Sequence, residues 1–233
     1  MGDPGVDEID PGALVRWADS VWARAPRDRI TVEGPDAERY LHSQLAQDIA
    51  SMTVGERRWS LLLEPTGRVV ALLGVERVDA ERFVLDGDPG TADAVEARLR
   101  RFLLRVAVTM EVDAATAAVP GDVEAERIRI GWPRVGADIA VGETIPAETG
   151  VVSASVSFTK GCYPGQELVE RMDSRSASAP FRLVRLDGDG LAVGDPVIVD
   201  GDEVGRVTSA TDGAAIARVR RNAAVGAPVG DAG

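Results

Sequence analysis

The chain's single cysteine and its single lysine lie two residues apart, at Cys162 and Lys160. Of the 26 basic residues, all but Lys160 are arginine. Lysine presents a compact charge on a flexible stem, whereas arginine presents a wide planar fork. A chain that otherwise uses arginine is therefore expected to need an ammonium group here. A thiol beside a cation can serve as a nucleophile, a metal ligand or a redox group.

The residues after Cys162 predict the start of a helix. Pro164 has the fixed φ that suits a first helical position, and residues 166–172 place their apolar side chains on one face. Unpaired N–H groups at a helix start and a nearby ammonium both favour a thiolate. Gly161 and Gly165 are expected to let a ligand approach the backbone. The alternative is a small buried apolar residue before a helix, which is what most lone cysteines are.

Composition narrows the classes of function. The net charge of −12 argues against binding to a nucleic-acid backbone, because the chain has no run of basic residues. A single cysteine excludes an internal disulfide bond. One cysteine and one histidine also exclude a self-contained zinc or iron–sulfur site, so no metal ligand set is expected within the chain.

Neither a secretion signal nor a membrane span is expected. The first residues, Met1 to Pro4, include an acidic side chain and do not resemble a signal peptide. The longest apolar run, Val69 to Val75, has the length of a strand. The sequence therefore predicts a cytoplasmic protein without a membrane partner.

The first half of the chain has the pattern of an α+β fold with a mainly antiparallel sheet. Alternating or apolar runs predict strands, and spacings of three and four residues predict helices. The expected strands are 29–32, 59–63, 69–75, 82–85 and 106–112, and the expected helices are 36–45 and 91–103. The chain has no G-x-G-x-x-G or P-loop sequence.

The second half divides into an irregular part and a β-rich part. Residues 113–122 are interpreted as a linker, and residues 126–150 as loops that lead into the Cys162 segment. Four short strands with turn sequences between them, at 181–186, 196–199, 203–208 and 214–219, predict a small barrel or sandwich. The expected division is an extension (1–28), an α+β lobe (29–122), a second lobe with the Cys162 segment (123–178) and a C-terminal β-barrel (179–233).

Residues 160–167, KGCYPGQE, match the pattern K-G-C-[FY]-x-G-Q-E at every fixed position. On this motif the chain resembles the YgfZ-type folate-binding proteins, a branch of the glycine-cleavage T-protein (aminomethyltransferase) superfamily. Residues 34–48 are similar to the opening helix of that superfamily, residues 61–68 to its first hairpin, and residues 131–136 to its G-x-P-x-x-G segment. The resemblance extends over roughly residues 29 to 221.

The resemblance implies an aminomethyltransferase-like folate-binding fold, with antiparallel α/β lobes around a central opening. It implies a tetrahydrofolate-type ligand, a role in iron–sulfur cluster assembly or repair, and iron–sulfur client or assembly proteins as partners. Cys162 and Lys160 would be the acting pair. The residues expected to contact folate or to form the motif are Gly161, Tyr163, Gly165, Gln166, Glu167, Asp48 and Arg171.

The chain departs from the aminomethyltransferases at their carboxylates. Ala71 and Leu72 stand where those enzymes carry two aspartates, and Arg129-Ile130 precede Gly131 where they carry Glu-Ala. General acid–base catalysis at a folate nitrogen needs a carboxylate within hydrogen-bond reach. Aminomethyl transfer is therefore not the expected activity.

Two alternatives remain open. A folate-dependent one-carbon transferase would need a replacement carboxylate, for which Asp48 and Asp138 are the candidates. A Cys–His hydrolase would need His42 within hydrogen-bond distance of Cys162.

Overall fold

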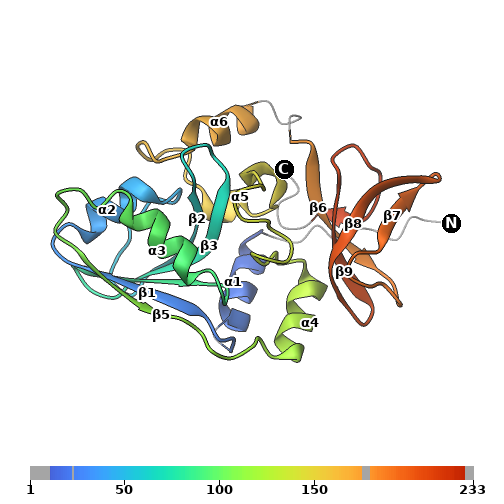
Figure 1. Ribbon diagram of the computed structural model, residues 1–233, viewed down its shortest axis with the longest axis horizontal. Coiled ribbons are helices and arrows are strands. Elements are labelled where there is room, and N and C mark those ends of the chain that lie inside the picture. Colours follow the sequence, from blue (N-terminus) through green and yellow to red (C-terminus); the bar gives the residue numbers. More distant parts are fainter. Residues whose placement is uncertain (1–10, 23, 175–178, 229–233) are drawn as a thin grey trace.

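The computed structural model describes residues 11–22, 24–174 and 179–228 (Figure 1). In chain order the elements are α1 (Pro11–Trp22), β1 (Asp28–Glu33), α2 (Ala37–Gln44), β2 (Arg57–Leu63), β3 (Val69–Arg77), β4 (Arg82–Gly87), α3 (Ala92–Arg100), β5 (Thr109–Asp113), α4 (Gly121–Ile130), the 3-10 helix η1 (Pro146–Glu148), α5 (Val152–Ser155), α6 (Gln166–Ser174), β6 (Phe181–Asp187), β7 (Pro196–Val199), β8 (Asp202–Thr211), β9 (Ala214–Arg220) and β10 (Ala227–Pro228).

The first sheet has the strand order β2-β3-β4-β1-β5, and every neighbouring pair is antiparallel. Strands β2 and β3 form a hairpin whose turn spans residues 64–68. Gly67 has a φ of +82°, a left-handed conformation that glycine adopts without steric cost. The α+β prediction and the mainly antiparallel sheet are confirmed, although the last strand begins at Thr109, three residues later than expected.

Both faces of this sheet are covered. Helices α2 and α3 pack on one face, where Leu41 and Leu99 join β-strand side chains in one apolar cluster. Helix α1 lies against the other face (Figure 1), where Trp22 packs with Trp59 and with side chains from residues 132–169. The segment that carries Cys162 is therefore held against a sheet buried on both sides.

Strand β3 carries Ala71 and Leu72, the positions where the aminomethyltransferases are expected to have two aspartates. Ala71 is fully buried in the cluster beneath α2 and α3, and Leu72 is 1% exposed in the opposite cluster. Successive side chains of a strand point to opposite faces. These two positions are therefore parts of two separate cores.

The second sheet lies at the other end of the molecule and has the order β10-β6-β9-β8-β7, all antiparallel (Figure 1). Within the described residues β7 and β10 are its two edges, so the closed C-terminal barrel is not confirmed. The four strands expected from the sequence all form. The boundaries proposed for the lobes, and the central opening between them, stay predictions.

The interpretation of residues 113–122 as a linker and of residues 126–150 as loops is wrong in part, because residues 121–130 form helix α4. Pro120 precedes the helix, and Gly131 ends it with a φ of +80°. Val123 packs into the core of the first sheet, whereas Ile128 packs against the second sheet. Helix α4 thus joins the two halves of the molecule.

No helix in the described parts of the chain combines the length and the apolar character needed to cross a membrane.

Candidate functional site

The Cys162 segment is positioned by a close contact between two glycines. Helix α6 (Gln166–Ser174) forms at the expected segment. Pro164 is not its first residue, because Gly165, which has a left-handed φ of +88°, lies between them. A Cβ atom at Gly165 would lie 2.9 Å from the carbonyl oxygen of Glu64 and 2.9 Å from the Cα of Gly67. Gly165 therefore lets the start of α6 touch the β2–β3 turn, whereas the sequence had suggested that it makes room for a ligand.

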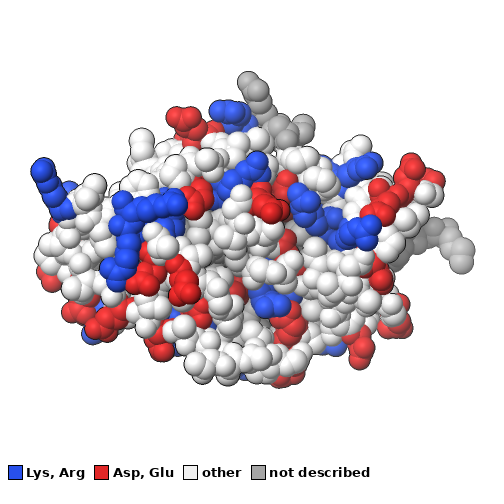
Figure 2. All heavy atoms as spheres, viewed as in Figure 1, with Lys and Arg blue, Asp and Glu red and all other residues white. Residues whose placement is uncertain are grey.

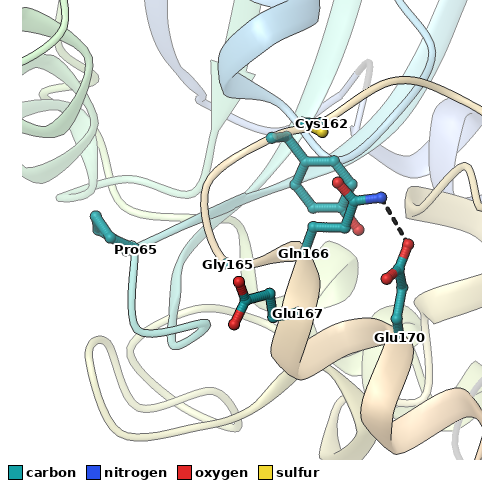
Figure 3. A pocket seen from close by; sticks show the side chains of 7 residues that line it. Pro65, Cys162, Gly165, Gln166, Glu167 and Glu170 are labelled. Carbon is teal, nitrogen blue, oxygen red and sulfur yellow. Dashed lines mark hydrogen bonds between the residues drawn. The ribbon is translucent and has the colours of Figure 1, made fainter.

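A pocket of about 570 Å³ opens at this contact (Figure 3). It is lined by Pro65 of the hairpin turn and by Cys162, Tyr163, Gly165, Gln166, Glu167 and Glu170 of the motif and α6. Figure 3 shows the Glu167 carboxylate on the side of Pro65, and the Gln166 amide turned toward Glu170. The Gln166 amide donates a hydrogen bond to the Glu170 carboxylate at 2.6 Å.

Cys162 is a free and exposed thiol at the rim of this pocket. The alternative interpretation of Cys162 as a buried apolar residue is therefore wrong. Because the side chain is exposed, its sulfur is accessible to a ligand or to a second protein.

Lys160 has a different role from the one expected. Its ammonium donates to the main-chain carbonyls of His42 and Leu45, the latter at 2.6 Å, and it lies 5.0 Å from the centre of the Tyr163 ring. His42 and Leu45 lie at the C-terminal end of α2, where carbonyl groups lack helical partners and a cation is stabilised. These contacts bind the motif to α2, and none of them places the ammonium on Cys162.

Two further hydrogen bonds join residues 154–157, which precede the motif, to the residues that follow α2. The backbone N–H of Ser157 donates to the carbonyl of Ala46 at 3.0 Å, and the Gln47 amide donates to the carbonyl of Ala154 at 3.3 Å. Leu45 in turn forms a β-bridge with Leu62. The end of α2 is therefore the support on which the loop before Cys162 rests.

Burial tunes two side chains of the motif. It lowers the pKa of Lys160 to about 8, an effect that the charge of Asp48 partly offsets. Burial, with a smaller effect of the Glu170 charge, raises the pKa of Tyr163 to about 12. At neutral pH the site therefore holds a charged ammonium against a neutral phenol.

His42 is arranged as a structural acceptor. Its Nδ1 accepts hydrogen bonds from the backbone N–H groups of Ile49 at 3.3 Å and Ala50 at 3.2 Å. Burial and the charge of Lys160 lower the pKa of His42, so the ring is neutral and its proton lies on Nε2. Nδ1 is engaged by these backbone donors, and no hydrogen bond joins His42 to Cys162 in the described part of the chain, so the Cys–His dyad gains no support.

Asp48 lies beside the ammonium, and its carboxylate is used in a turn. It accepts a hydrogen bond from the backbone N–H of Ser51 at 3.3 Å, and bonding to Ser51 lowers the pKa of Asp48. Its Oδ1 also lies 3.3 Å from the Nδ1 of His42, and its charge partly offsets the lowering of the Lys160 pKa. It is not among the residues that line the pocket.

Asp138, the other candidate carboxylate, is fully buried and saturated with partners. It forms an ion pair with Arg127 at 2.7 Å and accepts hydrogen bonds from the hydroxyls of Thr208 at 2.6 Å and Ser209 at 2.8 Å. It also accepts from the backbone N–H of Arg134 at 3.0 Å. This carboxylate joins α4 to strand β8 and has no free lone pair directed at the pocket.

The structure thus gathers five of the nine expected site residues around the pocket and places the other four outside it. The five are Cys162, Tyr163, Gly165, Gln166 and Glu167; the others are Lys160, Gly161, Asp48 and Arg171. Sequence reasoning missed Pro65 and Glu170 as pocket residues. Glu170 follows Gln166 by four positions, so helical spacing could have indicated it.

The described residues were compared with the ligand groups that hold metal ions in proteins. Among the described residues, no group of three or more His, Cys, Asp or Glu side chains is arranged to hold a metal ion. Cys162 can offer one thiolate ligand, and the pocket adds carboxylates rather than further thiols.

Comparison with known proteins places the fold. No family model matches the chain. An uncharacterized protein of Haemophilus influenzae is 27% identical over 187 residues, covering 64% of this chain and 67% of the relative. An aminomethyltransferase of Bordetella petrii is 31% identical over 137 residues, covering 52% of this chain and 37% of the relative.

The solved structure of the glycine cleavage system aminomethyltransferase T from Bartonella henselae matches with a TM-score of 0.70 and 18% identity. The match covers 83% of this chain and 76% of that one. The expected resemblance to the aminomethyltransferases is therefore confirmed, and the chain has their fold.

Proposed function

We propose that this chain, which has the aminomethyltransferase fold, binds a reduced folate and uses the Cys162 thiol in iron–sulfur cluster assembly or repair. Two observations carry the proposal. The chain's single thiol is exposed at the rim of a pocket. The positions where the aminomethyltransferases carry two aspartates are filled by the buried Ala71 and Leu72.

The pocket suits a reduced folate in size and in chemistry. Its volume of about 570 Å³ lies in the range of sites for small organic ligands. One edge of a pterin presents N–H donors side by side, and a carboxylate can accept two such donors at once. Glu167, exposed in the first turn of α6, would accept from this edge, and the Tyr163 ring would border the pterin plane. A bound reduced folate would supply a carrier for one-carbon groups.

The thiol would act as a ligand or attacking group for an iron–sulfur substrate. A thiolate is the ordinary ligand of iron in such clusters. Because Cys162 offers one ligand only, the substrate would stay shared with a client or assembly protein. Lys160 contributes indirectly, since its ammonium fixes the loop that presents the thiol.

The alternative of a one-carbon transferase is less well supported. It requires a carboxylate near the ligand, and neither proposed replacement lines the pocket. Asp138 is buried in an ion pair with Arg127, and Asp48 accepts a hydrogen bond from the backbone of Ser51.

The folate part of the proposal is tested by calorimetric titration of the purified protein with folinic acid. Glu167→Gln keeps the shape of the side chain and removes its charge, so it should weaken binding about tenfold. Glu81→Gln, an equally conservative change at an exposed turn of the first sheet, should leave binding unchanged. Absence of folinic acid binding by the wild type would overturn this part.

The thiol part is tested in cells that lack the protein. Cys162→Ala should fold like the wild type, because the side chain is exposed. It should fail to restore the activities of iron–sulfur enzymes. Full restoration by this variant would remove the thiol from the proposed function.

A further inference from the structure

A basic and apolar surface lies at the C-terminal end of α3. We call it the α3 patch, and it consists of Arg100, Arg101, Phe102, Leu104 and Arg105. Leu104 is 83% exposed and Phe102 is 38% exposed. Figure 2 shows basic side chains gathered over the region that α3 occupies in Figure 1. Exposed aromatic and aliphatic side chains surrounded by arginine are typical of protein interfaces.

The charge of the patch is opposite to that of the whole chain. The chain has a net charge of −12. The three arginines of the patch, counted with the two carboxylates that pair with Arg100 and Arg101, leave one net positive charge here. Arg100 pairs with Glu96 at 2.7 Å and Arg101 pairs with Glu64 at 2.9 Å. Exposed ion pairs of this kind contribute little stability, so a partner's carboxylates can replace the internal ones at small cost.

The buried Arg98 lies beneath Phe102 of the patch. Arg98 is 2% exposed, and its guanidinium lies 4.6 Å from the centre of the Phe102 ring. It donates to the carbonyl of Leu63 at 2.8 Å and to the Gln44 amide oxygen at 3.2 Å, and its Nη2 has no hydrogen-bond acceptor among the described residues. The ring of Phe102 thus rests on a buried cation rather than moving freely.

The end of the α3 patch has an unusual backbone conformation and an exposed leucine. Arg105 has a φ of +57°, a left-handed conformation that few residues other than glycine adopt. The neighbouring Leu104 side chain is exposed rather than packed in the core.

The patch is continuous with the Cys162 pocket. Arg101 binds the Glu64 carboxylate, and Pro65, the next residue, lines the pocket. A Cβ atom at Gly165 would lie 2.9 Å from the Glu64 carbonyl oxygen, so Gly165 and Arg101 both contact this residue. A molecule bound on the α3 patch would therefore lie beside the hairpin turn that forms one wall of the pocket.

We propose that the α3 patch is a docking surface for a partner protein that presents an acidic segment with apolar side chains. The local positive charge selects such a segment, and Phe102 with Leu104 provides the apolar contact. A polyanionic membrane or nucleic acid is disfavoured, because the rest of the chain repels an extended negative surface. The delivery of that partner to Cys162 rests on the proposed function; the docking itself does not.

The probe is a fluorescein-labelled synthetic peptide of alternating aspartate and glutamate with two leucines, followed by fluorescence anisotropy. The double variant Leu104→Ser, Arg105→Glu removes one apolar and one basic group that are both exposed, so its fold should be retained. It should bind the peptide about tenfold more weakly than the wild type. The matched control is Val193→Ser, Arg206→Glu, at two exposed positions of the second sheet's region.

Three results would overturn the docking surface. In the first, the double variant binds the acidic peptide as tightly as the wild type does. In the second, the wild type binds a peptide with lysine in place of the acids equally well. In the third, the wild type binds phosphatidylglycerol vesicles and not the acidic peptide. The double variant should still bind folinic acid. Loss of peptide binding with intact folate binding therefore separates this inference from the proposed function.

Discussion

Asp138 and the Cys162 pocket differ in how completely their polar groups are partnered. The Asp138 carboxylate is fully buried and bound by Arg127, two hydroxyls and a backbone N–H. Cys162 and Glu167 are exposed at an open pocket. An acidic residue near a motif is therefore not a catalytic one by position alone. Saturated groups hold the two halves of the molecule together, and unsaturated groups are left for a ligand.

The largest expected effect comes from removing a saturated group. Asp138→Ala leaves the Arg127 guanidinium buried without its main partner, which should lower the free energy of unfolding by about 3–5 kcal/mol. Urea denaturation measures it. Asp187→Ala is the control, because Asp187 is 72% exposed in a 3.3 Å pair with Arg185 and should change little. Wild-type stability of Asp138→Ala together with lost activity would make Asp138 a catalytic candidate again.

A smaller effect separates the two motif glycines. Gly165→Ala places a Cβ against the Glu64 carbonyl at a positive φ, which should cost about 1–3 kcal/mol of unfolding free energy. A Cβ atom at Gly161 would meet no other atom within 4 Å, so this glycine is the natural control. Gly161→Ala should leave stability unchanged. Equal stability of the two variants would mean that the contact between hairpin and helix does not hold the motif in place.

The pH dependence of stability reports on Lys160. Its pKa is about 8 in the folded chain and 10.5 when unperturbed, so the unfolded chain binds this proton more tightly. The free energy of unfolding of the wild type, relative to Lys160→Met, should therefore rise from pH 8 to pH 10, by about 1 kcal/mol once solvent screening is allowed for. Thermal or urea unfolding at several pH values measures the difference. A flat difference would show that the ammonium is not buried against α2.

The sequence predicted those parts of the site that depend on short-range patterns. Helix α6 follows from the apolar spacing of residues 166–172, and the hairpin follows from the turn at residues 64–67. The acceptors of Lys160 were not predictable, because they are backbone carbonyls more than a hundred residues away in the sequence. Main-chain acceptors leave no signature in residue types.

Helix α4 was missed for a related reason. One of its buried positions is Arg127, which is 0% exposed and breaks the apolar periodicity by which a helix is detected. The burial of that charge depends on Asp138, eleven residues away. The flanking signals, Pro120 before the helix and Gly131 after it, were present and could have indicated its ends.

The most direct test of the account is the rate at which iodoacetamide labels Cys162, with and without saturating folinic acid. The chain has one thiol, so the signal comes from this residue alone. If ligand and thiol share one pocket, folinic acid at about ten times the wild-type Kd should slow labelling about tenfold. Glu167→Gln, which is expected to bind about tenfold more weakly, should be slowed only about twofold at the same ligand concentration. An unchanged labelling rate, under conditions where calorimetry shows the folate to be bound, would contradict the central claim.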